Sequence, residues 1–529
     1  MTKFAPVFLF SVLASISAPV HAGSFKILGS RPTAMGGAFV AVAEGALAPY
    51  WNPAGLAFQR GFGVELPVGA NIEATGGVLN SARKISDSAA SISRLQDAQK
   101  SGAAVGLADL DTFSQAIINL KEMEGPGKGL EIDAAGGANF TIGRWAVTVN
   151  NFSSVGVDPV IDLSGVYLGS TTVTAAPAPS LFRTSSSESF DGIDLSKIAA
   201  STDAPSGLET ESSDLSLSVQ ALADGAGVKL GNLSAAQIAN ALINMAVAQN
   251  MSADEIRSAV AQIGAAMPIL LNLAGGRAFK ENNSNITVRG VSLTELVFSH
   301  GRKLPEFEKL RFLKGIAVGV GVKYVMADTM YARQYFLREG DSTKLKDIGD
   351  IAGQNTKQSS SLALDLGLLW RRDDILFKPR AGLVGKNVNS PVFAMPDAAV
   401  SDGYADYKLD SQWRFGVAVK PKNFWLVACD IDLTANHTEV SGYDSRNLSF
   451  GNEINIVNRP AFNFALRAGL VQNLAFSGAP MTYTGGFGLR LFGFNMDFAG
   501  AMSADKVAVG DNQELPSRAM ASLALSLNF

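Results

Sequence analysis

The sequence predicts an all-β membrane protein, an antiparallel transmembrane β-barrel of about 14 strands with an N-terminal luminal plug and helical loop insertions. Three observations lead to this fold class. Apolar and polar residues alternate with a period of two in many segments of about ten residues, the length of a tilted strand that crosses a bilayer. The gaps between these segments alternate between very short and long. Charged residues make up only 17% of the 529 residues, below the usual fraction in soluble domains.

Composition excludes several classes of function. The net charge is −4 and the sequence pI is about 5.6, which argues against a nucleic-acid partner because such a protein needs a basic surface. Cys429 is the single cysteine, so an intramolecular disulfide, a paired-cysteine redox centre and a cysteine-only zinc site are excluded. With three histidines in the chain, a histidine-rich metal site is also disfavoured. We therefore expect no cofactor and no metal.

Residues 1–22 are typical of a secretory signal peptide. Lys3 gives a positive start, residues 4–12 form a short apolar run, and Val20-His21-Ala22 fits a cleavage site. The alternative is a membrane anchor, but the apolar run is too short to span a hydrocarbon core about 30 Å thick. We predict an exported protein of the bacterial outer membrane.

Residues 61–529 are assigned to the barrel. The alternation is clear in residues 362–371, where leucines fall on one face, and it recurs along the chain; twelve or sixteen strands remain alternatives to fourteen. The predicted strands are 61–73, 130–142, 143–154, 285–299, 313–327, 358–370, 374–387, 407–420, 423–436, 446–456, 460–472, 480–491, 492–502 and 517–529.

Each predicted strand has one face for lipid and one for the lumen. The apolar sets, among them Leu364, Leu366 and Leu368 in one strand and Tyr407 and Leu409 in another, are expected to face lipid. The interspersed polar residues are expected to line the lumen: Asp365, Asp410, Arg414, Asp430, Asp432, Arg467 and Arg490. Asp430 and Asp432 could alternatively be calcium ligands, although a luminal polar row is the simpler interpretation.

The gaps also predict topology. Very short gaps follow the second, sixth, eighth, tenth and twelfth strands, as at Arg371-Arg372-Asp373, and longer gaps follow all odd strands. Outer-membrane barrels have short periplasmic turns and long outer loops. Both chain ends are therefore expected in the periplasm.

The last strand carries a candidate assembly signal. Leu523, Leu525, Leu527 and Phe529 share one face of a segment that alternates strictly and ends on an aromatic residue. This pattern resembles the signal that the barrel assembly machinery reads. The alternative is an edge strand of a secreted sandwich.

Two insertions in the outer loops, 74–129 and 155–284, are predicted to contain helices. In the second, a Ser-rich stretch precedes two helices that begin with the capping boxes Ser234–Gln237 and Ser252–Glu255. We expect a self-packed helical hairpin; a lid over the pore mouth or a membrane-surface helix is the alternative.

Residues 23–60 precede the first strand and lack its alternation. Small residues dominate, and the motifs that stand out are Met35-Gly36-Gly37 and Asn52-Pro53-Ala54. Arg31–Ala43 and Tyr50–Leu56 resemble the N-terminal hatch of FadL-type outer-membrane proteins, barrels with a small luminal plug that pass hydrophobic molecules. That resemblance implies a plug here. This sequence departs from the family at the acidic residue before the Tyr/Trp-Asn-Pro-Ala motif, since Glu44 is the nearest one.

The mature chain also resembles the outer-membrane proteins known as TraF-like conjugal transfer proteins. Segments such as Gly127–Asp133, Asp430–Asn436 and Gly485–Gly493 carry this resemblance, which covers the chain except for residues 155–284. It implies a link to conjugal transfer without specifying a mechanism.

Three functions follow as hypotheses. The first is a channel for uptake of hydrophobic small molecules, with outer-membrane lipid, the barrel assembly machinery and a hydrophobic ligand as partners. The second is a scaffold, linked to conjugal transfer or secretion, whose lumen would be filled by ion pairs such as Lys408–Asp410 and Arg414–Asp430. The third is an outer-membrane enzyme, which we disfavour because His300 and His437 lie in no nucleophile motif.

Overall fold

A computed structural model gives the fold of this protein. It describes residues 24–78, 125–161, 204–226, 234–248, 250–261, 283–305, 314–335, 355–459, 461–510 and 513–529, together with the single residues 123, 264 and 353. The signal peptide of residues 1–22 and the helices predicted in residues 80–122 lie outside the described residues.

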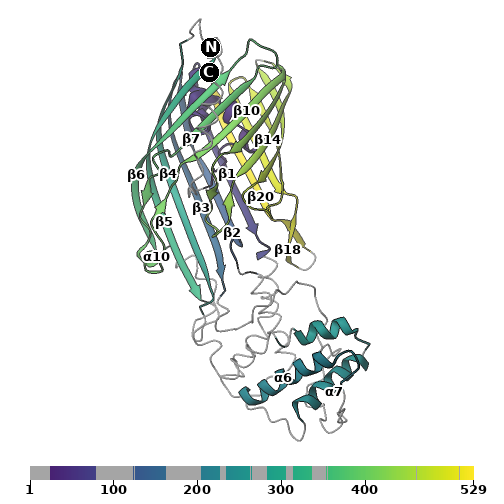
Figure 1. The fold of residues 1–529 in the computed structure, drawn as a ribbon. Coiled ribbons are helices and arrows are strands. Elements are labelled where there is room, and N and C mark those ends of the chain that lie inside the picture. The colour runs from purple at the N-terminus through teal and green to yellow at the C-terminus, as the bar shows by residue number, and fades with distance from the viewer. Residues whose placement is uncertain are drawn as a thin grey trace, which may run out of the picture.

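Fourteen antiparallel strands close into one barrel, as predicted (Figure 1). Consecutive barrel strands are neighbours, and β1 pairs with β20 to close the ring, with Leu66 opposite Leu525. The strands are β1 (Phe62–Thr75), β2 (Gly129–Ile142), β3 (Trp145–Val160), β4 (Asn285–Lys303), β5 (Ile316–Tyr335), β6 (Thr356–Arg371), β7 (Arg380–Lys386), β10 (Gln412–Lys422), β11 (Trp425–Asp432), β14 (Asn447–Asn458), β15 (Phe462–Asn473), β16 (Thr482–Leu491), β17 (Phe494–Ser503) and β20 (Arg518–Asn528).

The alternation of residues along the strands separates an apolar exterior from a polar interior. In β6, Leu366 and Leu368 are exposed on the outer face while Asp365 is buried inside, and in β5 Val322 is exposed while Lys323 is buried. A water-soluble barrel would not expose such a continuous apolar belt. The closed ring leaves no open sheet edge between its strands, which is the condition for spanning a bilayer with strands. The chain is therefore a transmembrane β-barrel of the bacterial outer membrane.

The barrel strands differ in length, and several predicted boundaries are wrong. The predicted strand 313–327 runs to Tyr335, the predicted strand 423–436 ends at Asp432, and two strands begin later than predicted. The predicted strand 374–387 begins at Arg380, so the gap after β6 is longer than predicted, and the predicted strand 407–420 begins at Gln412. Residues 387–411 leave the wall at Asn387 and Ser390, which both adopt positive φ angles. They form β8 (Val392–Phe393), α10 (Asp397–Ser401) and β9 (Tyr407–Lys408).

This inward segment explains why Leu409 does not face lipid as predicted. Leu409 packs with Phe393 of β8 against Val325 and Ala363, which are inward-facing residues of β5 and β6. Tyr407 is half-buried against the same cluster rather than exposed on the barrel exterior. Residues 387–411 thus lie on the luminal side of the long strands.

A second hairpin folds into the lumen between β11 and β14. It consists of β12 (Asn436–His437) and β13 (Asp444–Ser445). Its turn reaches across to three other strands: Tyr443 donates to Glu73 of β1, the Ser441 amide donates to Asp158 of β3, and Arg289 of β4 donates to the Glu439 carbonyl. A further short hairpin, β18 (Lys506–Gly510) and β19 (Gln513–Pro516), connects β17 to β20.

The insertion between β3 and β4 contains a self-packed group of helices (Figure 1). The helix α7 (Ala235–Ala248) begins at the Ser234–Gln237 capping box, and residues 253–261 are helical after the Ser252–Glu255 box. The prediction missed α6 (Glu209–Ala226) in the Ser-rich stretch. Its Leu215 packs against Ile243 and Ile256, so tertiary contacts stabilise a helix whose serine content is unfavourable.

Among the described residues, no helix is both long enough and apolar enough to cross a membrane.

Residues 24–60, called the N-terminal segment below, lie inside the ring of strands. Their elements are α2 (Ser30–Ala34), η1 (Val40–Val42), η2 (Gly45–Leu47), α3 (Ala48–Trp51) and η3 (Pro53–Phe58). These elements contact strands around the whole circumference: α2 contacts β15, β16, β17 and β20, η1 contacts β7, β10 and β11, η2 contacts β1 and β2, and η3 contacts β4, β5 and β6.

Candidate functional site: the lumen and its N-terminal segment

The N-terminal segment has an aromatic core of its own. The Trp51 side chain is fully buried, and its indole N–H donates to the Leu28 carbonyl at 3.0 Å. Phe25, Phe39 and Tyr50 surround Trp51, with ring centroids 5.5–5.7 Å from it. Tyr50 also stacks on Phe152 of β3, with centroids 5.1 Å apart. These contacts give the short helices a common core and join that core to the wall.

Asn52 connects the segment to β6. Its side-chain amide donates to the Val40 carbonyl at 3.3 Å and to the Leu368 carbonyl at 3.0 Å, and its Oδ1 accepts from the Ala54 amide at 3.1 Å. The backbone of Asn52 is extended, with φ −167° and ψ 104°, as expected for a residue before proline. Pro53 then starts η3, where its missing N–H has no cost.

Glycines in the wall and in the segment allow their backbones to approach each other. A Cβ on Gly367 of β6 would lie 2.3 Å from Asn52 Oδ1, and one on Gly319 of β5 would lie 2.1 Å from the Ala54 nitrogen. On the opposite wall, a Cβ on Gly36 would lie 2.6 Å from the Leu470 carbonyl oxygen, and Gly36 has a positive φ of 65°. The segment is therefore held at backbone distance from two sides of the barrel.

Ion pairs connect the segment to inward-facing strand residues. Lys26 binds Glu131 at 2.9 Å and Asp133 at 2.6 Å, both on β2. Arg31 binds Glu453 of β14 at 2.7 Å. Glu453 also binds Arg467, which in turn binds Asp497 at 2.6 Å. Charges on the segment thus continue into networks on the wall.

The luminal residues expected from the sequence have specific partners. Asp430 accepts from the backbone amides of Phe39 and Val40, each at 2.8 Å, and so binds the start of η1. Asp432 binds Arg414 at 2.5 Å. The expected Arg414–Asp430 pair is thus replaced by Arg414–Asp432, while the expected Lys408–Asp410 pair is present at 2.5 Å. Asp410 is buried but precedes β10, so it belongs to the inward segment rather than to a wall strand.

The other expected residues also lie inside. Asp365 binds Lys323 at 3.1 Å, and Arg490 lines the chamber that Arg467 and Glu453 line. Met35 packs its backbone against Gly451 and Gly469, and Gly37 lies beside Arg414 and Ser449.

The residues of the candidate assembly signal lie where β20 meets β1. Leu523, Leu525 and Leu527 pair with Val68, Leu66 and Val64 of β1; the first two leucines are half-buried and Leu527 is exposed. Phe529 exchanges two backbone hydrogen bonds with Phe62.

Sequence reasoning missed the charged residues of the segment and the lysine that faces its aromatic core. Lys26, Arg31, Glu44 and Arg60 are the charged residues of an otherwise largely small and apolar stretch, which was an available signal. Lys386, at the end of β7, was also missed. No group of three or more metal-ligating side chains occurs in the described part of the chain, and His300 and His437 lie in β4 and β12.

Glu44 balances several cations at one end of the segment. Its carboxylate is 3.0 Å from Arg31 Nη1 and 3.9 Å from Arg380 Nη1, and Lys420 lies nearby. Desolvation inside the barrel favours the protonated acid, but attraction by Arg31, Arg380 and Lys420 outweighs it. The pKa of Glu44 is therefore lowered from 4.5 to about 2.

Glu44→Gln is expected to loosen the segment at neutral pH. Because the folded-state pKa is depressed, the contribution of the carboxylate is present above pH 4.5 and is lost as the pH falls towards 2. The frequency of opening events of the wild-type protein in planar bilayers should therefore approach that of the variant over this pH range. At pH 7 the variant should open about two to five times more often, the effect of a partly exposed ion pair worth about 0.5–1 kcal/mol.

The matched control is Glu514→Gln, which removes an exposed carboxylate paired with Lys506 on the β18–β19 hairpin. This control should behave as wild type at every pH. Identical pH profiles for Glu44→Gln and the wild type would show that Glu44 does not hold the segment.

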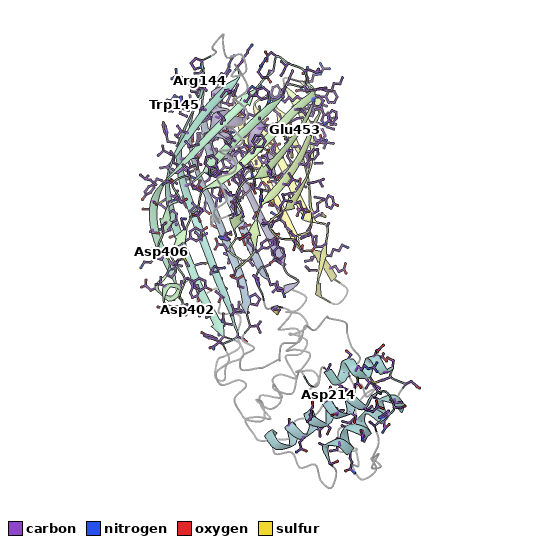
Figure 2. All side chains as sticks on the ribbon, in the orientation of Figure 1. Arg144, Trp145, Asp214, Asp402, Asp406 and Glu453 are labelled. Carbon is purple, nitrogen blue, oxygen red and sulfur yellow. The ribbon has the colours of Figure 1, made fainter. Side chains whose placement is uncertain are left out.

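Two chambers lie on opposite sides of the N-terminal segment. The proximal chamber, about 530 Å³, is lined by Glu44, Phe58, Glu453 and Arg467. It lies near the end of the barrel that holds the C-terminus, where Figure 2 labels Glu453. The distal chamber, about 490 Å³, is lined by Arg289, Met395, Tyr404, Asp406, Tyr407 and the turn of the β12–β13 hairpin. Two small cavities of about 40 and 60 Å³ lie against Ser24 and Lys26 on the distal side of the segment. The segment therefore occupies the middle of the lumen.

Comparison with known proteins gave a family and several structural likenesses. No curated protein matches the chain. The toluene transporter TbuX of Ralstonia pickettii is 13% identical, with a TM-score of 0.38, and the match covers 95% of this chain and 98% of TbuX. The monoaromatic hydrocarbon channel CymD is 11% identical, with a TM-score of 0.41 and coverage of 96% and 99%. A FadL homologue of Pseudomonas aeruginosa is 9% identical, with a TM-score of 0.40 and coverage of 96% and 100%.

These TM-scores are below 0.5, so the barrel rests on its own geometry and not on these likenesses. The family model is the stronger finding, because it matches residues 49–432, more than half of the chain, which include Asn52-Pro53-Ala54 and nine complete barrel strands from β1 to β11. The chain belongs to the family described as "F plasmid transfer operon, TraF, protein".

Proposed function

We propose that this protein is an outer-membrane channel through which small hydrophobic molecules enter, and that the N-terminal segment is its plug. The observation that carries this proposal is the position of the segment between two chambers of about 490 and 530 Å³. Each chamber is large enough for a small organic molecule. In the closed state the plug separates them, so passage requires it to move.

The walls on the distal side suit an apolar solute. Tyr404, Tyr407 and Met395 line the distal chamber, and Phe152, Leu293 and Leu409 line the small cavity between that chamber and the plug. TbuX and CymD, by their descriptions, carry toluene and monoaromatic hydrocarbons. A hydrophobic solute is therefore the class we propose to test first.

A disulfide between plug and wall gives a direct test. The hydroxyls of Ser30 in α2 and Ser522 in β20 are 3.0 Å apart, so Ser30→Cys with Ser522→Cys places two thiols within reach of a bond after a small shift. Cys429 should be replaced by serine first, because it is the native cysteine. Oxidation of the double variant is expected to abolish uptake of a neutral hydrophobic tracer by cells, and reduction to restore it.

The reduced double variant and the two single-cysteine variants are the matched controls, and all three should take up the tracer as the parent does. Uptake that is equal in the oxidised and reduced double variants would refute a moving plug. Absence of tracer uptake in the parent, relative to cells without the protein, would refute the channel itself.

A scaffold linked to conjugal transfer is the second candidate function. Two observations favour it: the family match, and the ion-pair networks of Lys26, Arg31 and Lys323 that occupy the lumen. On this reading a deletion strain would lose transfer of conjugative DNA while tracer uptake stayed unchanged. The reverse result would support the channel.

A further inference from the structure

Lys386 is a buried lysine that faces the aromatic core of the N-terminal segment. It is the last residue of β7, and only 4% of its surface is exposed. Its Nζ lies 3.2 Å from the centre of the Tyr50 ring, 4.9 Å from that of Phe25 and 5.8 Å from that of Phe152. The ammonium group is thus held by three aromatic rings, two of which belong to the segment.

The acidic groups near Lys386 are engaged elsewhere. Glu295 and Asp365 bind Lys323 at 3.2 and 3.1 Å, and Lys323 also bonds the side chain of Asn387. Arg414, the neighbouring cation, has its own carboxylate in Asp432. Within the described residues, no hydrogen bond or ion pair joins the Lys386 ammonium to another side chain. A buried cation without a counter-ion is costly, which is unusual for a purely structural position.

Lys386 also borders space that a ligand could reach. It lines the small cavity of about 40 Å³ together with Phe152, Leu293, Leu409 and Gln412. This cavity shares Tyr407 and Glu439 with the distal chamber. A molecule in the distal chamber, whose lining includes Arg289 and Lys408 as well as Tyr407, would therefore reach the Lys386 ammonium through this small cavity. Burial raises the pKa of the Glu439 carboxyl above its usual value.

We propose that Lys386 binds the carboxylate of a compact aromatic acid that reaches it from the distal chamber. Because this cavity holds only about 40 Å³, the ring of such an acid would have to push Phe152, Leu293 and Leu409 apart, and its carboxylate would then supply the counter-ion that Lys386 lacks. The ion pair would compete with the contact between Lys386 and Tyr50, and so would weaken the hold of the wall on the segment. This inference rests on the proposed channel function and assigns its ligand class.

Equilibrium binding of benzoate to the purified full-length protein tests the inference. Toluene serves as a neutral control ligand of matched shape, and benzylamine serves as a cationic control ligand. Calorimetry at pH 7 should show benzoate binding to the wild type. Lys386→Met should weaken benzoate binding at least tenfold and leave toluene binding unchanged, whereas Lys386→Arg should retain benzoate binding within about threefold. The control Lys506→Met, at an exposed lysine of β18, should bind benzoate as the wild type does.

Several results would overturn the proposal. These are no benzoate binding by the wild type, equal binding of benzoate by wild type and Lys386→Met, or equal binding of benzoate and benzylamine. If Lys386→Met does not fold into the heat-modifiable barrel, Lys386→Gln takes its place and the same criteria apply. The assay measures binding without passage. A failed benzoate test combined with loss of uptake in the oxidised Ser30→Cys/Ser522→Cys variant would therefore reject the ligand class and leave the channel intact.

Discussion

Replacing Asn52 and Pro53 together by alanine is expected to release the plug and to make cells sensitive to bulky hydrophobic antibiotics. Asn52 is fully buried and makes three hydrogen bonds, to Val40, Leu368 and Ala54. Alanine would leave the Leu368 carbonyl and the Ala54 amide without these partners, at a cost of about 1–3 kcal/mol for each unsatisfied buried group. Loss of Pro53 adds backbone freedom to the displaced state.

A change of about 3 kcal/mol alters the ratio of displaced to bound plug by about two orders of magnitude. The barrel itself should be unaffected, because the lost bonds lie on its luminal face and the strand ladder is unchanged. Antibiotic susceptibility and uptake of a hydrophobic tracer report the plug, and heat-modifiable migration on gels reports the barrel. A double variant with unaltered permeability and a folded barrel would show that this motif does not hold the plug.

The same contact can be broken from the wall. A Cβ on Gly367 would lie 2.3 Å from Asn52 Oδ1, so Gly367→Ala should displace Asn52 without changing the plug sequence. Gly500→Ala is the matched control, since a Cβ there would meet its nearest atom, the Met520 carbonyl oxygen, at an ordinary 3.7 Å. Only the Gly367 variant should reproduce the antibiotic sensitivity of the double alanine variant.

The barrel could be predicted from the sequence because lipid outside and charge inside impose a period of two on every strand. Lys323 and Asp365 alternate with Val322 and Leu366 for this reason. The same rule produced the error at Tyr407 and Leu409. They alternate like a wall strand, but residues 387–411 fold inward and bury them against β5 and β6. Alternation shows that a segment has two faces, and it does not show which medium each face meets.

The luminal site was predicted less completely, because its contacts join distant parts of the chain. Asp430 was expected in the lumen, yet its partners are the backbone amides of Phe39 and Val40, nearly 400 residues away. Arg31 and Glu453 are separated by 422 positions. A residue type and a spacing identify a polar face, whereas pairing across the lumen depends on where the segment comes to rest. Lys386 could not be distinguished from other lysines by pattern alone, since its environment comes from Tyr50 and Phe25.

Removing Phe529 is expected to reduce assembly of the barrel into the outer membrane. The backbone of Phe529 exchanges hydrogen bonds with Phe62, its amide donating at 2.9 Å and its carbonyl accepting at 3.0 Å, at the seam where β20 meets β1. Phe529 is 76% exposed, so its ring contributes little apolar burial to the folded barrel. A strong effect of the ring on yield would therefore have to arise during assembly.

Two variants separate the backbone from the ring. Deletion of Phe529 removes both, whereas Phe529→Ala keeps the seam hydrogen bonds and removes the ring. The matched control is Phe492→Ala, which removes an aromatic ring that is 82% exposed in the turn between β16 and β17, at the same end of the barrel. If the assembly machinery recognises the terminal aromatic residue, deletion and Phe529→Ala should both lower the amount of heat-modifiable barrel in the outer membrane, and Phe492→Ala should not.

The fraction of Phe529→Ala that does assemble should resist denaturant as well as the wild-type barrel does. Normal yield of Phe529→Ala, or an equal loss in Phe492→Ala, would mean that the ring acts as one more interfacial aromatic residue and that closure of the seam does not depend on its recognition.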